Sequence, residues 1–422
     1  MWLLDFVLRD MEDKRNQCYN KSMKVNKSSR AQGTGERRGK VMKFLFASDS
    51  FKGTLSSEQT QEILARAAKD VFGEVEYSGV AVADGGEGTT DAVISAEKGE
   101  KVFVKVHGPL MEETEAYYGV FGDGKAVIEM AAASGLPMVP AEKRNPLNTT
   151  TYGTGELIRD ALDKGYTDIS IAIGGSATND GGMGCVRALG VRFLDADGNE
   201  LEGFGRDLEK IASIDDSGLD ARIKGARITV MCDVTNPLCG PDGATYTFGK
   251  QKGGTPEILD RLEKGMCNYR DLVKGLYGID ADQIRGGGAA GGLGTALKVF
   301  LGGEMKSGID TVLDLIDFNG RLEGVDLVVT GEGRTDWQSC FGKVMQGVGV
   351  RAKAKGVAAV GLCGSLGKGA EQIFDHGIVS LMTTVDAPMP LEEALGRAEE
   401  LYYKGAVRMF RFVKAGMDIA AK

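Results

Sequence analysis

The sequence predicts an α/β protein of two domains, in which a doubly wound parallel-sheet domain is split in the sequence by an inserted mixed α/β domain. Its 422 residues exceed the length over which a single hydrophobic core keeps growing. Short apolar runs repeatedly lead into a Gly-rich polar loop and then a helix-compatible segment, which is typical of parallel α/β sheets. Between Lys101 and Met130 the pattern changes to alternating segments joined through Asp123-Gly124, which indicates antiparallel hairpins and therefore a second domain.

Each strand-loop-helix unit is expected to begin with an apolar strand. The expected strands cover residues 44–48, 80–83, 169–173, 325–330 and 357–363. The helix after the first strand has a start signal, because Ser56 and Gln59 have the spacing of a capping box. From the change of pattern we expect the first domain to comprise residues 42–90 and 285–422, and the inserted domain residues 91–284.

The N-terminal segment differs from the rest of the chain. From Lys14 to Lys40 it is rich in Lys, Arg, Ser, Asn and Gly and contains little that could be buried, so we expect residues 1–41 to be a disordered or loosely attached extension. The apolar run near the start is interrupted by Asp5 and is too short to span a membrane. It also lacks the basic n-region and the A-x-A-like cleavage site of a secretory signal. We expect the functional part to begin at Met42.

Charge and cysteine usage exclude some function classes. The net charge of −9 argues against a nucleic-acid partner, because phosphate-backbone binding relies on clustered Lys and Arg. The seven cysteines are scattered and contain no C-x-x-C pair, which suits a reducing compartment and offers no zinc motif. We therefore expect a cytoplasmic protein that needs no membrane, and we leave a homo-oligomer open.

Glycine is in excess, with 62 residues in the chain. The glycines cluster in loops that follow the predicted strands, and in open α/β sheets ligands bind beyond the carboxyl ends of the strands. Bare backbone N–H groups and helix N-termini attract anions. The sequence therefore predicts a phosphate-binding site at this edge of the sheet.

Four acidic residues lie in these loops. They are Asp84, Asp180, Glu332 and Asp336. Carboxylate oxygens suit Mg²⁺, which bridges carboxylates to substrate phosphates, and an acid can also deprotonate an attacking hydroxyl. The alternative is that each is a turn or capping residue.

Two lysines could meet a phosphate as point charges. Lys52 follows the first strand in the segment DSFKG, where Ser50 offers a hydroxyl to a substrate, and Lys343 follows GEGRTD. A solvated surface position is the alternative for both lysines.

The remaining candidates are less specific. The segment GGGAAGGLG, which begins at Gly286, formally contains the dinucleotide fingerprint G-x-G-x-x-G but lacks a preceding apolar strand, so it is either a nucleotide-phosphate loop or a close-packing loop. Asp233 and Asn236 could bind substrate hydroxyls or a metal, or simply form a turn. His107 and His376 lie at turns, and no G-x-S-x-G segment occurs, which disfavours a Ser-His-Asp hydrolase.

Taken together, the loops resemble those of the bacterial glycerate kinase family, of the glycerate 2-kinase type. The segments that carry the resemblance are DSFKG, ADGGEGT, GGSATNDGG, CDVTNPL, GGGAAGGLG and GEGRTD, in that order between Met42 and Val413. The resemblance implies a flavodoxin-like domain with an inserted α/β domain and the active site between them. It also implies ATP-dependent phosphorylation of D-glycerate, with 2-phosphoglycerate as product, in glycerate/glyoxylate catabolism.

The resemblance also implies roles for single residues. Lys52 would stabilise the transferring phosphoryl group, and Asp84, Asp180 or Asp336 would serve as metal ligands and base. Asp233 and Asn236 would lie near glycerate. The backbone that would cradle nucleotide or substrate phosphate comprises Gly174, Gly175, Ser176, Gly286, Gly287, Gly288, Gly291 and Gly292. The alternatives are a dinucleotide-dependent oxidoreductase and a binding module that senses nucleotides or sugar acids without turnover.

Overall fold

A computed structural model of the chain describes residues 41–421, and Met42–Lys422 forms one compact unit. The predicted N-terminal extension lies outside the described residues except for Val41. Within the described part of the chain, no helix is both long enough and apolar enough to cross a membrane.

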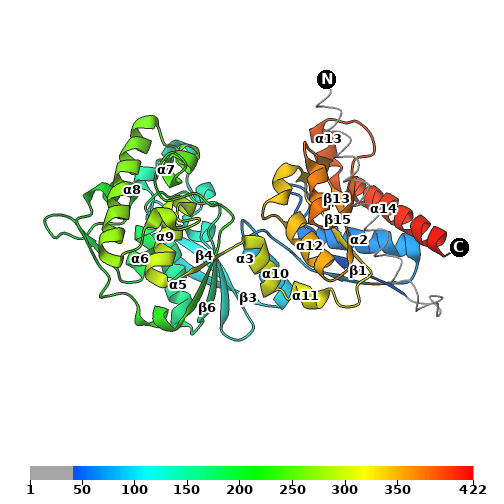
Figure 1. Cartoon of the computed structure of the whole chain (residues 1–422), viewed down its shortest axis with the longest axis horizontal. Coiled ribbons are helices and arrows are strands. Elements are labelled where there is room, and N and C mark those ends of the chain that lie inside the picture. Colours follow the sequence, from blue (N-terminus) through cyan, green and yellow to red (C-terminus); the bar gives the residue numbers. More distant parts are fainter. Residues whose placement is uncertain (1–40, 422) are drawn as a thin grey trace, which may run out of the picture. The chain divides into compact units, whose positions relative to one another are not determined.

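The first sheet is built from both ends of the described chain. Its five parallel strands, in spatial order, are β15 (Ile378–Thr383), β13 (Ala358–Cys363), β11 (Leu327–Thr330), β1 (Met42–Phe46) and β2 (Val75–Gly79). Numbered within this sheet alone, the order is 2-1-3-4-5, which is the flavodoxin-like arrangement. Figure 1 shows the blue start of the chain, β1 and α2, beside the orange and red end, β13, β15 and α14. The predicted fold class is confirmed.

Alternate residues of β1 enter different cores. Phe44 and Phe46 pack against α2 (Ser57–Phe72) and α14 (Ala398–Ala420). Leu45 belongs to the opposite face, which is covered by α10 (Gly308–Leu315) and α12 (Val344–Ala354). Helices on both faces explain why the parallel strands read as continuous apolar runs.

The capping box at the start of α2 forms as predicted. The hydroxyl of Ser56 accepts a hydrogen bond from the backbone N–H of Gln59 at 3.2 Å, and the Gln59 side chain accepts one from Ser56 N at 2.8 Å. This helix start fixes where the chain leaves the loop that follows β1.

The second sheet is mixed. Its strands, in spatial order, are β10 (Glu304–Lys306), β9 (Arg227–Met231), β6 (Asp168–Ala172), β5 (Lys125–Glu129), β4 (Glu113–Phe121) and β3 (Glu100–His107). The pairs β3–β4 and β4–β5 are antiparallel, as the alternating pattern predicted, whereas the other pairs are parallel. The larger helices whose buried residues join this core are α5 (Tyr152–Asp163), α6 (Met183–Ala188), α8 (Pro256–Tyr277) and α9 (Ala289–Leu301).

One expected strand is wrong. Residues 80–83 were expected to pair, but β2 ends at Gly79 and these residues have no strand assignment, although all four are buried. Only the first of them continues the ladder, because Val80 N donates to Phe46 O at 2.9 Å at the end of β1. An apolar run indicates that a segment is buried but does not show that it pairs in a sheet, and this segment is buried without strand pairing.

The domain limits stay a prediction. The second predicted domain boundary, near residue 285, assigns α9 and β10 to the first domain. In the structure, β10 pairs with β9 and α9 packs in the core of the second sheet. We propose that the chain returns to the first domain after Lys306.

Candidate active site

The order in which strands are added to the first sheet reverses at β1, because β2 lies on one side of it and β11 on the other. Such a switch point leaves a crevice at the carboxyl ends of the strands. A cavity of about 720 Å³, the larger cavity, lies there. The polar residues that line it include Asp49, Ser50, Lys52, Thr54, Asp84, Glu332, Arg334, Lys343 and Ser365.

Three carboxyl groups gather in the larger cavity. Asp49 lies in the loop after β1, and burial, followed by the negative charges of Asp84 and Glu332, raises its pKa to about 6. The N–H of Ser50 donates to Asp49 Oδ1 at 2.7 Å, which partly offsets this effect. Carboxylates that crowd one another in this way are a suitable oxygen donor set for a hard cation such as Mg²⁺.

Glu332 is held from one side. Its Oε1 accepts hydrogen bonds from the hydroxyls of Thr335, at 2.9 Å, and Ser339, and its side chain is 8% exposed. Burial raises the pKa of Glu332, while these two hydroxyls and the charge of Lys343 act against the rise. The carboxylate therefore stays oriented by short-range contacts from its own loop.

Cationic groups face the same cavity. Lys52, from the loop after β1, and Lys343, just before α12, both line it. The charge of Lys52 opposes the rise in the pKa of Asp49, and the charge of Lys343 does the same for Glu332. Each lysine therefore lies close enough to a carboxylate for the two charges to interact.

Part of the lining of the larger cavity is apolar. This apolar wall is formed by Val385, Ala387, Pro388, Met389, Leu391, Leu395 and Leu401. These residues come from the loop after β15, from α13 (Leu391–Gly396) and from the start of α14.

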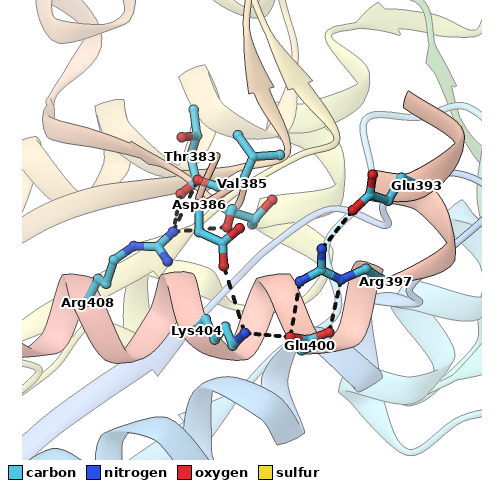
Figure 2. A network of polar contacts seen from close by, with 9 residues as sticks. Thr383, Val385, Asp386, Glu393, Arg397, Glu400, Lys404 and Arg408 are labelled. Carbon is cyan, nitrogen blue, oxygen red and sulfur yellow. Dashed lines mark hydrogen bonds and ion pairs between the residues drawn. The ribbon is translucent and has the colours of Figure 1, made fainter. Parts of the chain in front are cut away.

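A polar network holds this wall in place (Figure 2). Arg408 of α14 donates to the backbone carbonyls of Thr383, Thr384 and Val385 at 3.2, 2.9 and 3.3 Å. One turn earlier, Lys404 pairs with Asp386 at 3.8 Å. The loop after β15 is therefore fixed to α14 by its main chain.

A second cavity, the smaller cavity, has a volume of about 500 Å³. Residues from three loops line it, together with one lysine: Asp84, Gly85, Gly86, Gly174, Gly175, Ser176, Cys232, Asp233 and Lys252. Asp84 lines both cavities. The two cavities therefore adjoin at this residue.

Lys252 is only 2% exposed, which is unusual for a lysine. Its ammonium donates to Ser176 Oγ at 2.8 Å and to the carbonyl of Thr178 at 2.6 Å. Burial lowers the pKa of Lys252 to about 7, and the negative charge of Asp180 opposes the fall. A small anion in the smaller cavity would restore the charged form.

Asp233 follows β9 and faces the smaller cavity. Its Oδ1 accepts the N–H of Gly308 at 2.9 Å, at the N-terminus of α10. Burial raises the pKa of Asp233 to about 6, and the charge of Asp84 adds to the rise. A carboxyl group with a pKa near neutral is suited to accept a proton.

Two predicted acids have other partners. Asp180 is fully buried and accepts hydrogen bonds from Thr151 N and Oγ1, both at 2.7 Å, from Gly182 N and from Gly184 N. Asp336 caps the short helix Trp337–Cys340, because its Oδ1 accepts Gln338 N at 2.9 Å. Neither side chain lines the larger or the smaller cavity, which favours the capping alternative for both.

Asn236 and the glycine-rich segment also point to structural roles. The Asn236 amide donates to the carbonyl of Asp242 at 2.7 Å and so closes its own loop. A Cβ added at Gly288 or Gly291 would lie 2.1 Å from a backbone carbonyl oxygen, and the segment follows a turn rather than a strand. The geometry favours close packing for this segment and removes the reason to expect a dinucleotide site.

Sequence reasoning missed Asp49 and Lys252. Asp49 had a signal, since it directly follows the first strand in the segment that contains Lys52. Lys252 had none, because it lies in a Lys-rich helical turn, Lys250–Lys252, that reads as a solvated surface.

The fold and the site define the class of protein. A flavodoxin-like sheet and a mixed sheet meet around carboxylates and lysines at the switch point, as in α/β enzymes that handle phosphates. A model of the glycerate kinase family matches residues 44–414, and the chain belongs to this family. It is accordingly a kinase, an enzyme that transfers a phosphoryl group.

Individual relatives agree with this assignment. The chain is 47% identical to a glycerate kinase of Bacillus subtilis over 85% of its own length and 94% of the relative. It is 44% identical to glycerate 2-kinase of Escherichia coli K12 over 90% of its length and 99% of the relative. A crystal structure from Salmonella typhimurium LT2, assigned as glycerate kinase 2, superposes with a TM-score of 0.81 at 44% identity and covers 90% of this chain and 100% of that one.

Proposed function

We propose that the protein transfers the γ-phosphoryl group of ATP to the 2-hydroxyl of D-glycerate, in the cytoplasm, and yields 2-phosphoglycerate for organic acid catabolism. One observation carries the proposal: Asp84 lines both cavities, so ligands in the two cavities would meet at this carboxylate. The Escherichia coli relative, named a glycerate 2-kinase, supports the choice of hydroxyl.

The larger cavity suits ATP. Its lining offers an apolar wall of Val385, Met389 and Leu395 for a flat base, and it also offers Lys52 and Lys343 for the phosphates. A ligand with an apolar end and a strongly anionic end matches this division. Arg408 contributes indirectly, since it holds the carbonyls of the wall.

The smaller cavity suits glycerate. It is lined by the buried ammonium of Lys252, which would pair with the substrate carboxylate, and by the N–H-rich loop at Gly174 and Gly175. Asp233 would orient the 2-hydroxyl and accept its proton, because its pKa is raised to about 6.

The carboxylates of Asp49, Asp84 and Glu332 fit Mg²⁺, since their mutual repulsion is what a divalent cation relieves. When bound, Mg²⁺ would neutralise phosphate charge. Lys52 and Lys343 would add to this neutralisation and orient the γ-phosphoryl group towards the smaller cavity. Phosphoryl transfer depends mainly on such positioning and charge stabilisation.

The test is direct. The protein is incubated with ATP, Mg²⁺ and D-glycerate, and with a panel of other small hydroxy acids, and products are identified by ³¹P and ¹H NMR. We expect ADP and 2-phosphoglycerate, and loss of both products in Lys52→Ala. A product phosphorylated at the 3-hydroxyl would overturn the regiochemistry, and absence of any product with glycerate would overturn the substrate.

A further inference from the structure

A cluster of two thiols and a carboxylate lies away from both cavities. Cys239, Glu263 and Cys267 each place one ligand atom within 4.8 Å of the others. Glu263 and Cys267 are four residues apart on α8 and so share a helix face. Cys239 approaches that face from the loop after β9, and Gly240 N donates to Glu263 Oε1 at 2.6 Å.

The carboxylate of Glu263 is incompletely satisfied. Glu263 is 9% exposed, and its Oε2 is buried without any hydrogen-bond partner among the described residues. A buried, unpaired carboxylate oxygen is costly unless a proton or a cation compensates it. This oxygen provides evidence for a ligand that is independent of the spacing of the thiols.

Arg270, a cation on the same helix whose charge acts on Cys267, is engaged elsewhere. Arg270 pairs with Asp271 at 2.8 Å and with Asp282 at 3.1 Å. Asp282 in turn accepts Cys239 N at 2.9 Å, so the loop backbone, Asp282 and Arg270 form a chain of contacts beside the cluster. The positive charge of Arg270 would support thiolates at this place without occupying the position between them.

We propose that Cys239, Glu263 and Cys267 bind a thiophilic divalent cation of the Zn²⁺ type. Sulfur and carboxylate ligands at about 2.0–2.3 Å from a tetrahedral Zn²⁺ lie roughly 3.3–3.8 Å apart. The three atoms therefore need to approach one another by at most about 1.5 Å. A water molecule completes the fourth position.

Binding releases protons. The two thiols each lose one proton to solvent, and Glu263 binds as a carboxylate, so one Zn²⁺ displaces two protons and no electrons are exchanged.

The site would act on the structure of a loop. Asp233 and Cys239 both lie in the segment that follows β9, and Gly240, next to Cys239, joins this segment to α8 through its hydrogen bond to Glu263. A metal bound at this end would anchor the segment that also lines the smaller cavity. We therefore assign the site a structural role rather than a place in the reaction.

The test uses the full chain and Co²⁺ as a spectroscopic substitute for Zn²⁺. In wild type we expect one Co²⁺ per chain, a thiolate-to-cobalt charge-transfer band and the strong visible bands of a tetrahedral site, with two protons released per Zn²⁺. Cys267→Ser and Glu263→Gln should weaken binding roughly tenfold or more. Cys340→Ser, which removes another buried thiol, should leave the spectrum unchanged.

Two results would overturn the proposal. One is a wild-type protein that shows no thiolate-to-cobalt band, or a Co²⁺ affinity that stays at the wild-type value in both Cys267→Ser and Glu263→Gln when circular dichroism shows each variant folded. The other is mass spectrometry of the freshly purified protein that finds Cys239 linked to Cys267 as a disulfide, because then the two thiols pair with each other.

Discussion

Replacing Lys252 with Met should make the protein more stable and should lower its activity with glycerate. The substitution keeps a long, unbranched side chain but removes the ammonium, which is 2% exposed and donates to Ser176 and Thr178. Burial of a charge with two neutral acceptors is unfavourable for folding. A buried ammonium at this position is explained if its charge binds the substrate.

The magnitude follows from the pKa. Burial lowers the pKa of Lys252 from 10.5 to about 7. A pKa difference of one corresponds to about 1.4 kcal/mol, so the buried group destabilises the folded state at pH 7 by about 4 kcal/mol. The variant leaves the Ser176 and Thr178 acceptors unpaired, which offsets about 1–3 kcal/mol, so the net gain in stability should be about 1–3 kcal/mol.

The sign of the pH dependence gives a sharper test. The folded state releases the Lys252 proton as pH rises through about 7, whereas the unfolded chain keeps it until about 10.5. The unfolded state therefore holds more protons in this window, and the free energy of unfolding of the wild type rises there. The advantage of Lys252→Met should be largest below about pH 7 and should shrink as pH approaches 10.

Urea unfolding followed by circular dichroism at several pH values measures this difference, and steady-state kinetics measures activity. The kcat/KM for glycerate should fall roughly 10- to 100-fold, as expected for loss of a charged hydrogen bond. Lys250→Met, an exposed lysine of the same turn, is the matched control and should change neither quantity. A stability difference that is the same at pH 7 and pH 9.5 would refute the lowered pKa. Unchanged kinetics would refute the substrate contact.

Three further predictions concern other parts of the site. Asp84→Asn should lower kcat/KM by roughly 100-fold or more. Asp336→Asn should cost about 1 kcal/mol of stability and leave kcat within roughly tenfold of the wild type. Steady-state rates and thermal melts distinguish the two variants, and equal effects on rate would contradict the assignment. Arg408→Met should raise the KM for ATP several-fold with little change in kcat, and an unchanged KM would argue against the apolar wall as the base site. Gly291→Ala should destabilise by about 2–4 kcal/mol in urea because its Cβ would lie 2.1 Å from a backbone oxygen, while Gly302→Ala, with a similar positive φ but no atom within 4 Å, should cost clearly less.

Local chemistry made much of the fold and part of the site predictable. The strand at β1, the capping box at Ser56 and the β3–β5 meander depend on residues that are close in the sequence, so their patterns are legible there. Lys52, Asp84 and Glu332 follow the same logic, because loops after parallel strands gather at one edge of the sheet. The family resemblance rests on these loops.

Other properties depended on which distant segments pack together. Asp180 and Asp84 both lie in Gly-rich loops after apolar segments, yet Thr151 and the loop backbone enclose the first, whereas the second lines two cavities. Lys252 looks like a surface residue until the loop that carries Ser176 and Thr178 buries it. The sequence by itself determined the order of the strands and loops and the chemical groups that the loops carry. Only the tertiary structure decided which groups are exposed to a ligand, because burial and side-chain direction are set by contacts between residues far apart along the chain.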